Sequence, residues 1–361
     1  MNLPIQHGYL VLADISGYTS FLAKSELDHA QDILRSILTL LIGELTPTLE
    51  LAEVEGDAVF AHAPASTISR GELLLELIEA AYVAFRDRRR TMEHNATCPC
   101  NACHAISTLD LKFITHYGDY VLQNVGGTKK PLGSCVNLIH RMLKNRVREA
   151  TGWRGYALFS EASLDHMGVR PEGMHEGVEA YEHLGAVRTY SINLDARYTE
   201  LVEGRRMFLP PEEADIVLTH AFSAPPPIVW DWLTNPAKRA LWMQGASWAV
   251  KERPRGRTGP GAQNHCATLG AIEHILDWRP FRYFTAYYRR GFLNMMVTGE
   301  LEPTTDGTHL HWNMKLDSPL PRWMLCPIRK FLSARTRMRV KSRLQTIEQF
   351  ISGVAMRERV C

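Results

Sequence analysis

Two carboxylates in this sequence stand where carboxylates could do chemistry. Asp14 follows the apolar run 10–13 and precedes a Ser-Gly turn, so a buried strand would hold it at the mouth of a sheet, beside free helix N–H groups. Asp57 lies in the predicted hairpin turn Glu55-Gly56-Asp57. Two such carboxylates could hold Mg²⁺ or Mn²⁺ on a triphosphate. The alternative is that Asp14 caps a helix and Asp57 is an ordinary turn residue.

A polar pair on one predicted helix could complete such a site. Asn137 and Arg141 are four residues apart in the helix that opens at Gly133, so they lie on one face of it. An arginine and an amide there could stabilise charge on a transferring phosphoryl group. The alternative is a cap and a solvated side chain.

The elements that must position these residues alternate along the first half of the chain. An apolar strand at 9–13 is followed by a helical pattern over 19–45, the hairpin and a second helix over 70–90. Strands at 109–117 and 120–125, a helix from 134 and two more strands complete the order. We expect an α+β fold in which helices cover one face of a largely antiparallel sheet.

Three motifs in this half resemble those of the class III adenylate/guanylate (nucleotidyl) cyclase homology domain (DUF2652-like), across roughly residues 5–193. They are Asp14-Ile15-Ser16-Gly17-Tyr18-Thr19, Glu55-Gly56-Asp57 and Gly133-x-x-Val136-Asn137-x-x-x-Arg141. The resemblance implies a ferredoxin-like domain with sites shared across a homodimer. It also implies that Asp14, Ile15 and Asp57 of one chain hold the metal. Asn137 and Arg141 of the other chain would be catalytic.

The sequence departs from that family where the nucleotide is read. The base-selecting positions fall on Glu53 and Lys130; Glu at the first is usual in guanylyl cyclases, and Lys at the second is typical of neither kind. The late strand that normally supplies a triphosphate-binding Lys reads His183-Leu184-Gly185, so that Lys is missing unless Arg188 substitutes. The base stays open, and so do two alternatives, an active cyclase and an inactive pseudo-cyclase.

Three cysteines crowd into the stretch Cys98-Pro-Cys100-Asn-Ala-Cys103, flanked by His94 and His104. Thiolates and imidazoles are the preferred ligands of Zn²⁺, and four of them would close a tetrahedral site. The alternative is a reduced loop with incidental thiols.

Residues 214–353 resemble the START-like (SRPBCC) helix-grip superfamily, which includes polyketide cyclases and lipid-transfer proteins. The resemblance rests on an opening strand, a Pro-rich helix start at 224–230, an Asn-Pro turn, the segment 259–266 and a long final helix. It implies a curved antiparallel sheet around a cavity for a hydrophobic small molecule or lipid. The candidate lining residues are Trp230, Trp242, His265 and Tyr287; for most aromatic residues here the alternative is core packing.

Composition limits the remaining classes. The 361 residues carry a formal net charge of only +2, which does not call for nucleic acid. The basic final helix could touch an anionic membrane surface weakly, or be a solvated face. No signal peptide and no apolar run of membrane-spanning length is apparent, so we expect a cytoplasmic protein. Seven cysteines, an odd number, argue against a disulfide framework.

Together these patterns predict a cyclase-like domain at 1–195, a linker at 196–213, a START-like domain at 214–353 and a tail at 354–361. The first hypothesis is a protein that binds a metal–nucleoside triphosphate, could form a 3′,5′-cyclic nucleotide and is regulated by its second domain. The alternative is an inactive pseudo-cyclase that acts as a lipid or polyketide sensor or carrier.

Overall fold

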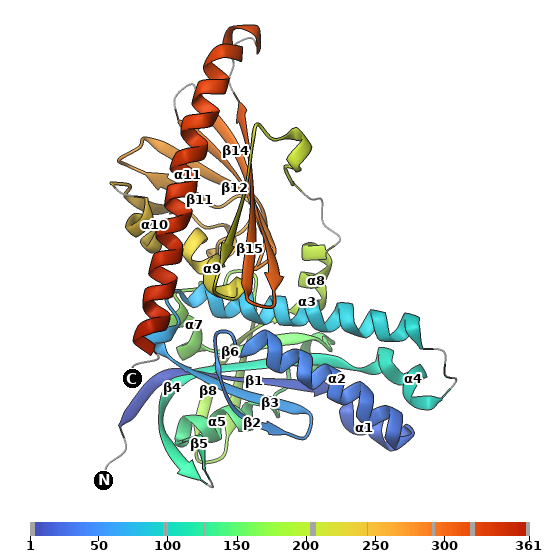
Figure 1. Ribbon diagram of the computed structural model, residues 1–361. Helices are drawn as coiled ribbons and strands as arrows, with labels where there is room; N and C mark the ends of the chain where they lie inside the picture. Colours follow the sequence, from blue (N-terminus) through green and yellow to red (C-terminus); the bar gives the residue numbers. More distant parts are fainter. Residues whose placement is uncertain are drawn as a thin grey trace. The chain divides into compact units, whose positions relative to one another are not determined.

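The computed structural model describes residues 4–96, 98, 100–125, 127–202, 207–243, 245–290, 293–317 and 322–358. Contacts divide the chain into two compact units, Met1–Gly204 and Arg205–Cys361 (Figure 1). Of the stretch 196–213 expected as a linker, residues up to 202 belong to a helix of the first unit. Leu209 is buried in the second unit, where its N–H donates to Thr298 Oγ1 at 3.0 Å.

The first unit is a mixed α/β layer structure built on one sheet. Its elements are β1 (Ile5–Ser16), α1 (Tyr18–Lys24), α2 (Leu27–Leu45), β2 (Glu50–Glu55), β3 (Ala58–Pro64), α3 (Gly71–Asn95), α4 (Asn101–Ala105), β4 (Asp110–Val125), β5 (Thr128–Leu132), α5 (Ser134–Met142), α6 (Val147–Thr151), β6 (Tyr156–Ser160), α7 (Glu161–Met167), β7 (His175–Tyr181), β8 (Gly185–Asn193) and α8 (Leu194–Val202). The strand order is β2-β3-β1-β4-β6-β8-β7, with β5 paired to the far end of β4. Among these pairs β4–β6 is parallel and the others are antiparallel, which confirms the expected α+β, ferredoxin-like class.

Helices lie on both faces of this sheet, so the expectation that they cover one face is wrong. α2 and α3 lie on one side, and α5 lies on the other (Figure 1). The apolar face of α5 presents Val136, Ile139 and Met142 to the buried cluster that contains Leu10 and Leu12 of β1. Since side chains alternate along a strand, the even-numbered positions of β1 face α5.

Two local predictions are wrong, for tertiary reasons. The helical pattern over 19–45 forms two helices, because Glu26 is extended and its carboxylate accepts the N–H groups of Asn101 and Ala102 at 3.2 and 3.0 Å. The strands expected at 109–117 and 120–125 form one strand, β4. Gly118 lies inside this strand. A glycine suits that position because a Cβ there would come within 2.3 Å of Cys135 Sγ.

The second unit is an antiparallel sheet with a long terminal helix. Its elements are β9 (Ile216–Phe222), α9 (Pro226–Thr234), α10 (Pro236–Trp242), β10 (Trp248–Glu252), β11 (Gln263–Cys266), β12 (Ala271–Arg279), β13 (Tyr283–Arg290), β14 (Leu293–Thr304), β15 (Gly307–Asp317) and α11 (Arg322–Glu358). The strand order is β10-β11-β12-β13-β14-β15-β9. Leu344, Ile347 and Ile351 of α11 are buried. A curved antiparallel sheet with a terminal helix is the expected helix-grip fold.

A charged network is buried inside this second unit. Arg239 Nη1 donates to both carboxylate oxygens of Glu273, at 2.8 and 2.7 Å, and the two side chains are 3% and 0% exposed. Asn264 Nδ2 and the Tyr288 hydroxyl also donate to Glu273, each at 2.5 Å. Arg239 holds the pKa of Glu273 below its usual range, against the opposing effect of burial, so both side chains stay charged.

Removing one charge of this pair should destabilise the fold more than removing both. We expect Glu273→Ala to lower the free energy of unfolding by about 3–5 kcal/mol, because it leaves Arg239 buried and unpaired. The double change Arg239→Met with Glu273→Leu should cost less than the sum of Arg239→Met alone and Glu273→Leu alone. Thermal unfolding of the full chain measures this cycle. Lys315→Ala, which breaks an exposed pair with Glu213, is the control.

A buried histidine should make the first unit acid-sensitive. His116 in β4 contacts Ser160 Oγ through Nδ1 at 2.8 Å, and burial lowers its pKa to about 4. Below pH 6.5 His116 binds a proton in the unfolded chain but stays neutral in the folded one. The free energy of unfolding should therefore fall by about 3 kcal/mol between pH 6.5 and 4. His116→Gln should flatten that slope, measured by amide exchange of β4, whereas exposed His94→Gln should not. Equal slopes in all three proteins would contradict this account.

Candidate functional site

Asp14 lies at the end of the central strand β1. Its neighbours across the sheet are Ala58 of β3 and Lys112 of β4. The alternation of β1 places Asp14 on the face that carries α5, and its side chain is 15% exposed. The carboxylate is therefore mostly buried but still reachable by solvent.

Asp57 is held next to Asp14 by the hairpin turn between β2 and β3. Gly56 takes a positive φ of 62°, a conformation that favours glycine. The Asp57 carbonyl accepts the N–H of Ile15 at 3.2 Å, so the turn is bonded to the residue that follows Asp14. The Ile15 side chain is buried, which leaves only its main chain for a polar ligand.

The charges here are only partly balanced. Burial and, next, the negative charge of Asp14 raise the pKa of Asp57 to about 6; Lys112 acts against that rise. Lys112 Nζ pairs with Asp14 Oδ2 at 3.0 Å and donates to the Leu143 carbonyl at 3.4 Å. Two repelling carboxylates that share one ammonium group suit a divalent cation, so Asp14 and Asp57 fit the implied Mg²⁺ or Mn²⁺.

Sequence reasoning missed Lys112. A signal was available, because the predicted strand over 109–117 puts Leu111, Phe113 and Thr115 on one face and leaves a lysine on the other. Only the register of β1 with β4 places that lysine opposite Asp14.

Asn137 and Arg141 share the exposed face of α5, as their spacing predicted, while Val136, Ile139 and Met142 are buried. Among the residues that the structure describes, neither side chain has a hydrogen bond or ion pair with Asp14 or Asp57 of the same chain. The two halves of the expected site therefore do not meet directly within one chain.

The two predicted base-selecting residues contact each other. Lys130 Nζ of β5 donates to Glu53 Oε1 of β2 at 2.6 Å. The pair is about a third exposed, so solvent weakens it. The two charges compensate each other, so a nucleotide base at this position would contact a pair with no net charge.

The position of the missing lysine is an exposed turn. His183 lies in the turn between β7 and β8 with a φ of 66°. Arg188, the possible substitute, pairs with Glu161 and Glu176 at 3.4 and 3.5 Å. Its charge is therefore shared with two carboxylates in the first unit.

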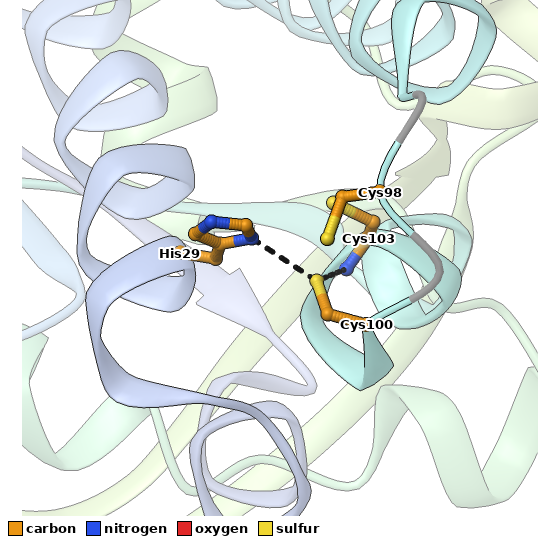
Figure 2. Close-up of side chains that lie close together, drawn as sticks. All are labelled: His29, Cys98, Cys100 and Cys103. Carbon is orange, nitrogen blue, oxygen red and sulfur yellow. Dashed lines mark hydrogen bonds between the residues drawn. The ribbon is translucent and has the colours of Figure 1, made fainter.

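The three predicted zinc-binding cysteines do come together. Cys98, Cys100 and Cys103 lie beside His29 of α2, and we refer to these four residues as the thiol cluster (Figure 2). His29 was not recognised from the sequence, because it lies 71 residues before Cys100. The flanking His94 and His104 are exposed and outside the cluster.

The predicted cavity residues of the second unit differ in environment. Trp230 is fully buried and packs edge-on against Trp278, with ring centroids 4.7 Å apart. Trp242 is buried and donates from Nε1 to the Trp232 carbonyl at 2.9 Å. Tyr287 is half-buried and His265 is exposed. Trp230 and Trp242 therefore belong to the packed core of the second unit.

Four basic side chains of the terminal helix are exposed. Arg335, Arg337, Arg339 and Lys341 of α11 are exposed, as a solvated or membrane-facing surface requires. Among the described helices, none has a stretch both long and apolar enough to cross a membrane.

Two known families match separate parts of the chain. Residues 34–151 match the family described as "Protein of unknown function (DUF2652)". Residues 213–346 match "Polyketide cyclase / dehydrase and lipid transport". An uncharacterized protein of Mycobacterium tuberculosis is 35% identical over 99 residues, which are 27% of this chain and 46% of that protein. The match thus spans less than half the length of that relative.

Solved structures show similarity as well. The guanylyl cyclase Cya2 is 16% identical, covers 53% of this chain and 93% of its own, and has a TM-score of 0.43. The adenylyl cyclase CyaB from P. aeruginosa is 16% identical over 53% of this chain and 95% of its own, with a TM-score of 0.37. Protein MLL2253 from Mesorhizobium loti is 19% identical over 38% and 96%, with a TM-score of 0.31. The chain thus contains a region similar to the DUF2652 family and, in its C-terminal half, a region similar to the family described as polyketide cyclase / dehydrase and lipid transport.

Proposed function

We propose that the first unit, in a homodimer, binds a metal–nucleoside triphosphate and converts it to a 3′,5′-cyclic nucleotide, the ribose 3′-oxygen displacing pyrophosphate from the α-phosphorus. The observation that carries this proposal is the pairing of Asp14 with Asp57, two sheltered carboxylates whose repulsion Lys112 relieves in part. A single carboxylate at a strand end would be an ordinary cap. A carboxylate whose proton affinity is raised by a neighbouring carboxylate, as Asp14 raises that of Asp57, favours a cation and its anionic ligand.

Asp14 and Asp57 would hold Mg²⁺ or Mn²⁺, which when bound would lower the pKa of the ribose 3′-hydroxyl and neutralise phosphate charge. Lys112 is within reach of the same ligand, and we propose that its ammonium group leaves Asp14 for a phosphate oxygen. Arg141 of the partner subunit would stabilise charge on the transferring phosphoryl group, and the partner subunit's Asn137 would orient the ribose. The exposure of the α5 polar face suits such a shared site.

A second candidate function is favoured by the Glu53–Lys130 and Asp14–Lys112 pairs. Both neutralise groups that a working cyclase would turn towards its substrate. On this reading the first unit is a pseudo-cyclase, and the second unit carries or senses a hydrophobic ligand. The match of residues 213–346 to a lipid transport family supports a ligand role for the second unit under either proposal.

Activity separates the two functions. The full chain would be incubated with Mn²⁺ and each of ATP, GTP, CTP and UTP, and cyclic products identified by mass spectrometry. We expect one base to give product, Asp57→Asn to abolish it, and Arg141→Ala to slow it by about 10²–10³-fold. Exposed Asp165→Asn should leave the rate unchanged. No product with any nucleotide, together with binding of a fluorescent fatty acid, would establish the pseudo-cyclase instead.

A shared site also predicts complementation between two inactive chains. Asp57→Asn and Arg141→Ala proteins should each be inactive or nearly so. Mixing equal amounts under conditions of subunit exchange should restore about a quarter of wild-type activity, since half the dimers would carry one intact site of two. Light scattering would follow the dimer in each sample. Recovery should not occur if each chain builds its own site.

A further inference from the structure

The thiol cluster joins parts of the first unit that are far apart in sequence. His29 lies in the first turn of α2, Cys98 and Cys100 lie between α3 and α4, and Cys103 lies within α4 (Figure 2). One ligand atom from each residue lies within 4.8 Å of all the others. Imidazole nitrogen and three sulfurs therefore point at a common centre.

The spacing of these atoms is close to that of a tetrahedral zinc site. Zn–S bonds of about 2.3 Å and Zn–N bonds of about 2.0–2.1 Å place neighbouring donor atoms about 3.5–3.8 Å apart. His29 Nδ1 and Cys100 Sγ are 3.1 Å apart, and the largest separation is at most 4.8 Å. Shifts of about an ångström in exposed or half-buried side chains would close the site.

The chemistry of the donors points the same way. All three cysteines are free thiols, not joined in a disulfide. Cys100 and Cys103 have the C-x₂-C spacing common in zinc sites. The N–H of Cys103 donates to Cys100 Sγ at 3.4 Å, a contact that would orient and stabilise a thiolate ligand.

A separate clamp already holds the two segments together. The Glu26 carboxylate, just before α2, accepts the Asn101 N–H at 3.2 Å, the Asn101 side-chain amide at 3.1 Å and the Ala102 N–H at 3.0 Å. Asn101 and Ala102 are the two residues between Cys100 and Cys103. The clamp therefore fixes the turn that carries two cysteines next to the helix that carries His29.

We propose that His29, Cys98, Cys100 and Cys103 bind one Zn²⁺ in a closed, structural site that fastens the α3–α4 segment to α2. Binding would displace the three thiol protons, and four protein ligands would leave no position for substrate. The site would be separate from the Asp14–Asp57 pair and would not depend on the proposed nucleotide chemistry.

The metal content of the purified chain tests the proposal directly. The protein would be produced in zinc-supplemented medium, purified without chelators and analysed by plasma mass spectrometry. We expect one zinc per chain. Cobalt replacement should give the ligand-field and sulfur charge-transfer absorption of tetrahedral Co²⁺. Iron in place of zinc, or a disulfide among the three cysteines of the metal-free protein purified under reducing conditions, would overturn the assignment.

Variants identify the fourth ligand. His29→Ala should weaken zinc binding at least tenfold in competition with a chromophoric chelator, and His29→Cys should restore it with a fourth sulfur. His104→Ala, which changes an exposed histidine next to Cys103, is the matched control and should bind like wild type. Equal affinity in the His29→Ala and wild-type proteins would overturn the role of His29.

Amide exchange distinguishes a fastening role from general instability. Removing zinc with a chelator should increase exchange in α4 and the first turns of α2 while β1 and β4 stay protected. Circular dichroism would verify that each variant is folded. Unchanged exchange around α4 after complete zinc removal would contradict the structural role.

Discussion

Strand β1 is the element on which the first unit depends. Its residues 9–13 are buried, and it is hydrogen-bonded on one side to β3 and on the other to β4. Because side chains alternate, a slip of one residue would move Leu10 and Leu12 off the face that receives α5 and turn Asp14 to the opposite side. The same register that builds the core thus aims the carboxylate. Packing and the candidate chemistry cannot vary independently here.

Charge balance separates the structural ion pairs from the candidate site. In the second unit, Glu273 is buried and fully matched by Arg239 and two further donors, so it has nothing left to offer a ligand. Asp57 is in the reverse situation. It is sheltered, it lies beside another carboxylate, and the ammonium group of Lys112 is bonded to Asp14 instead. Incomplete compensation of a buried charge is costly unless a ligand completes it.

The first unit therefore has two candidate cation sites, and their ligand atoms differ in chemical type. The carboxylates of Asp14 and Asp57 are hard oxygen ligands, suited to Mg²⁺ or Mn²⁺ together with phosphates. The thiol cluster offers soft sulfur and imidazole, suited to zinc, and closes without a substrate. One arrangement suits chemistry at the sheet, and the other suits holding α4 beside α2.

Local patterns in the sequence determined the buried strand at β1, the Gly56 turn, the polar face of α5 and the C-x₂-C spacing, because each depends on neighbours a few residues away. The α+β class followed from their order. Only the tertiary structure decided that Lys112 meets Asp14, that Lys130 meets Glu53 and that His29 joins the cysteines. These contacts depend on strand register and helix packing, which bring together residues whose separation along the chain carries no information about their distance in space.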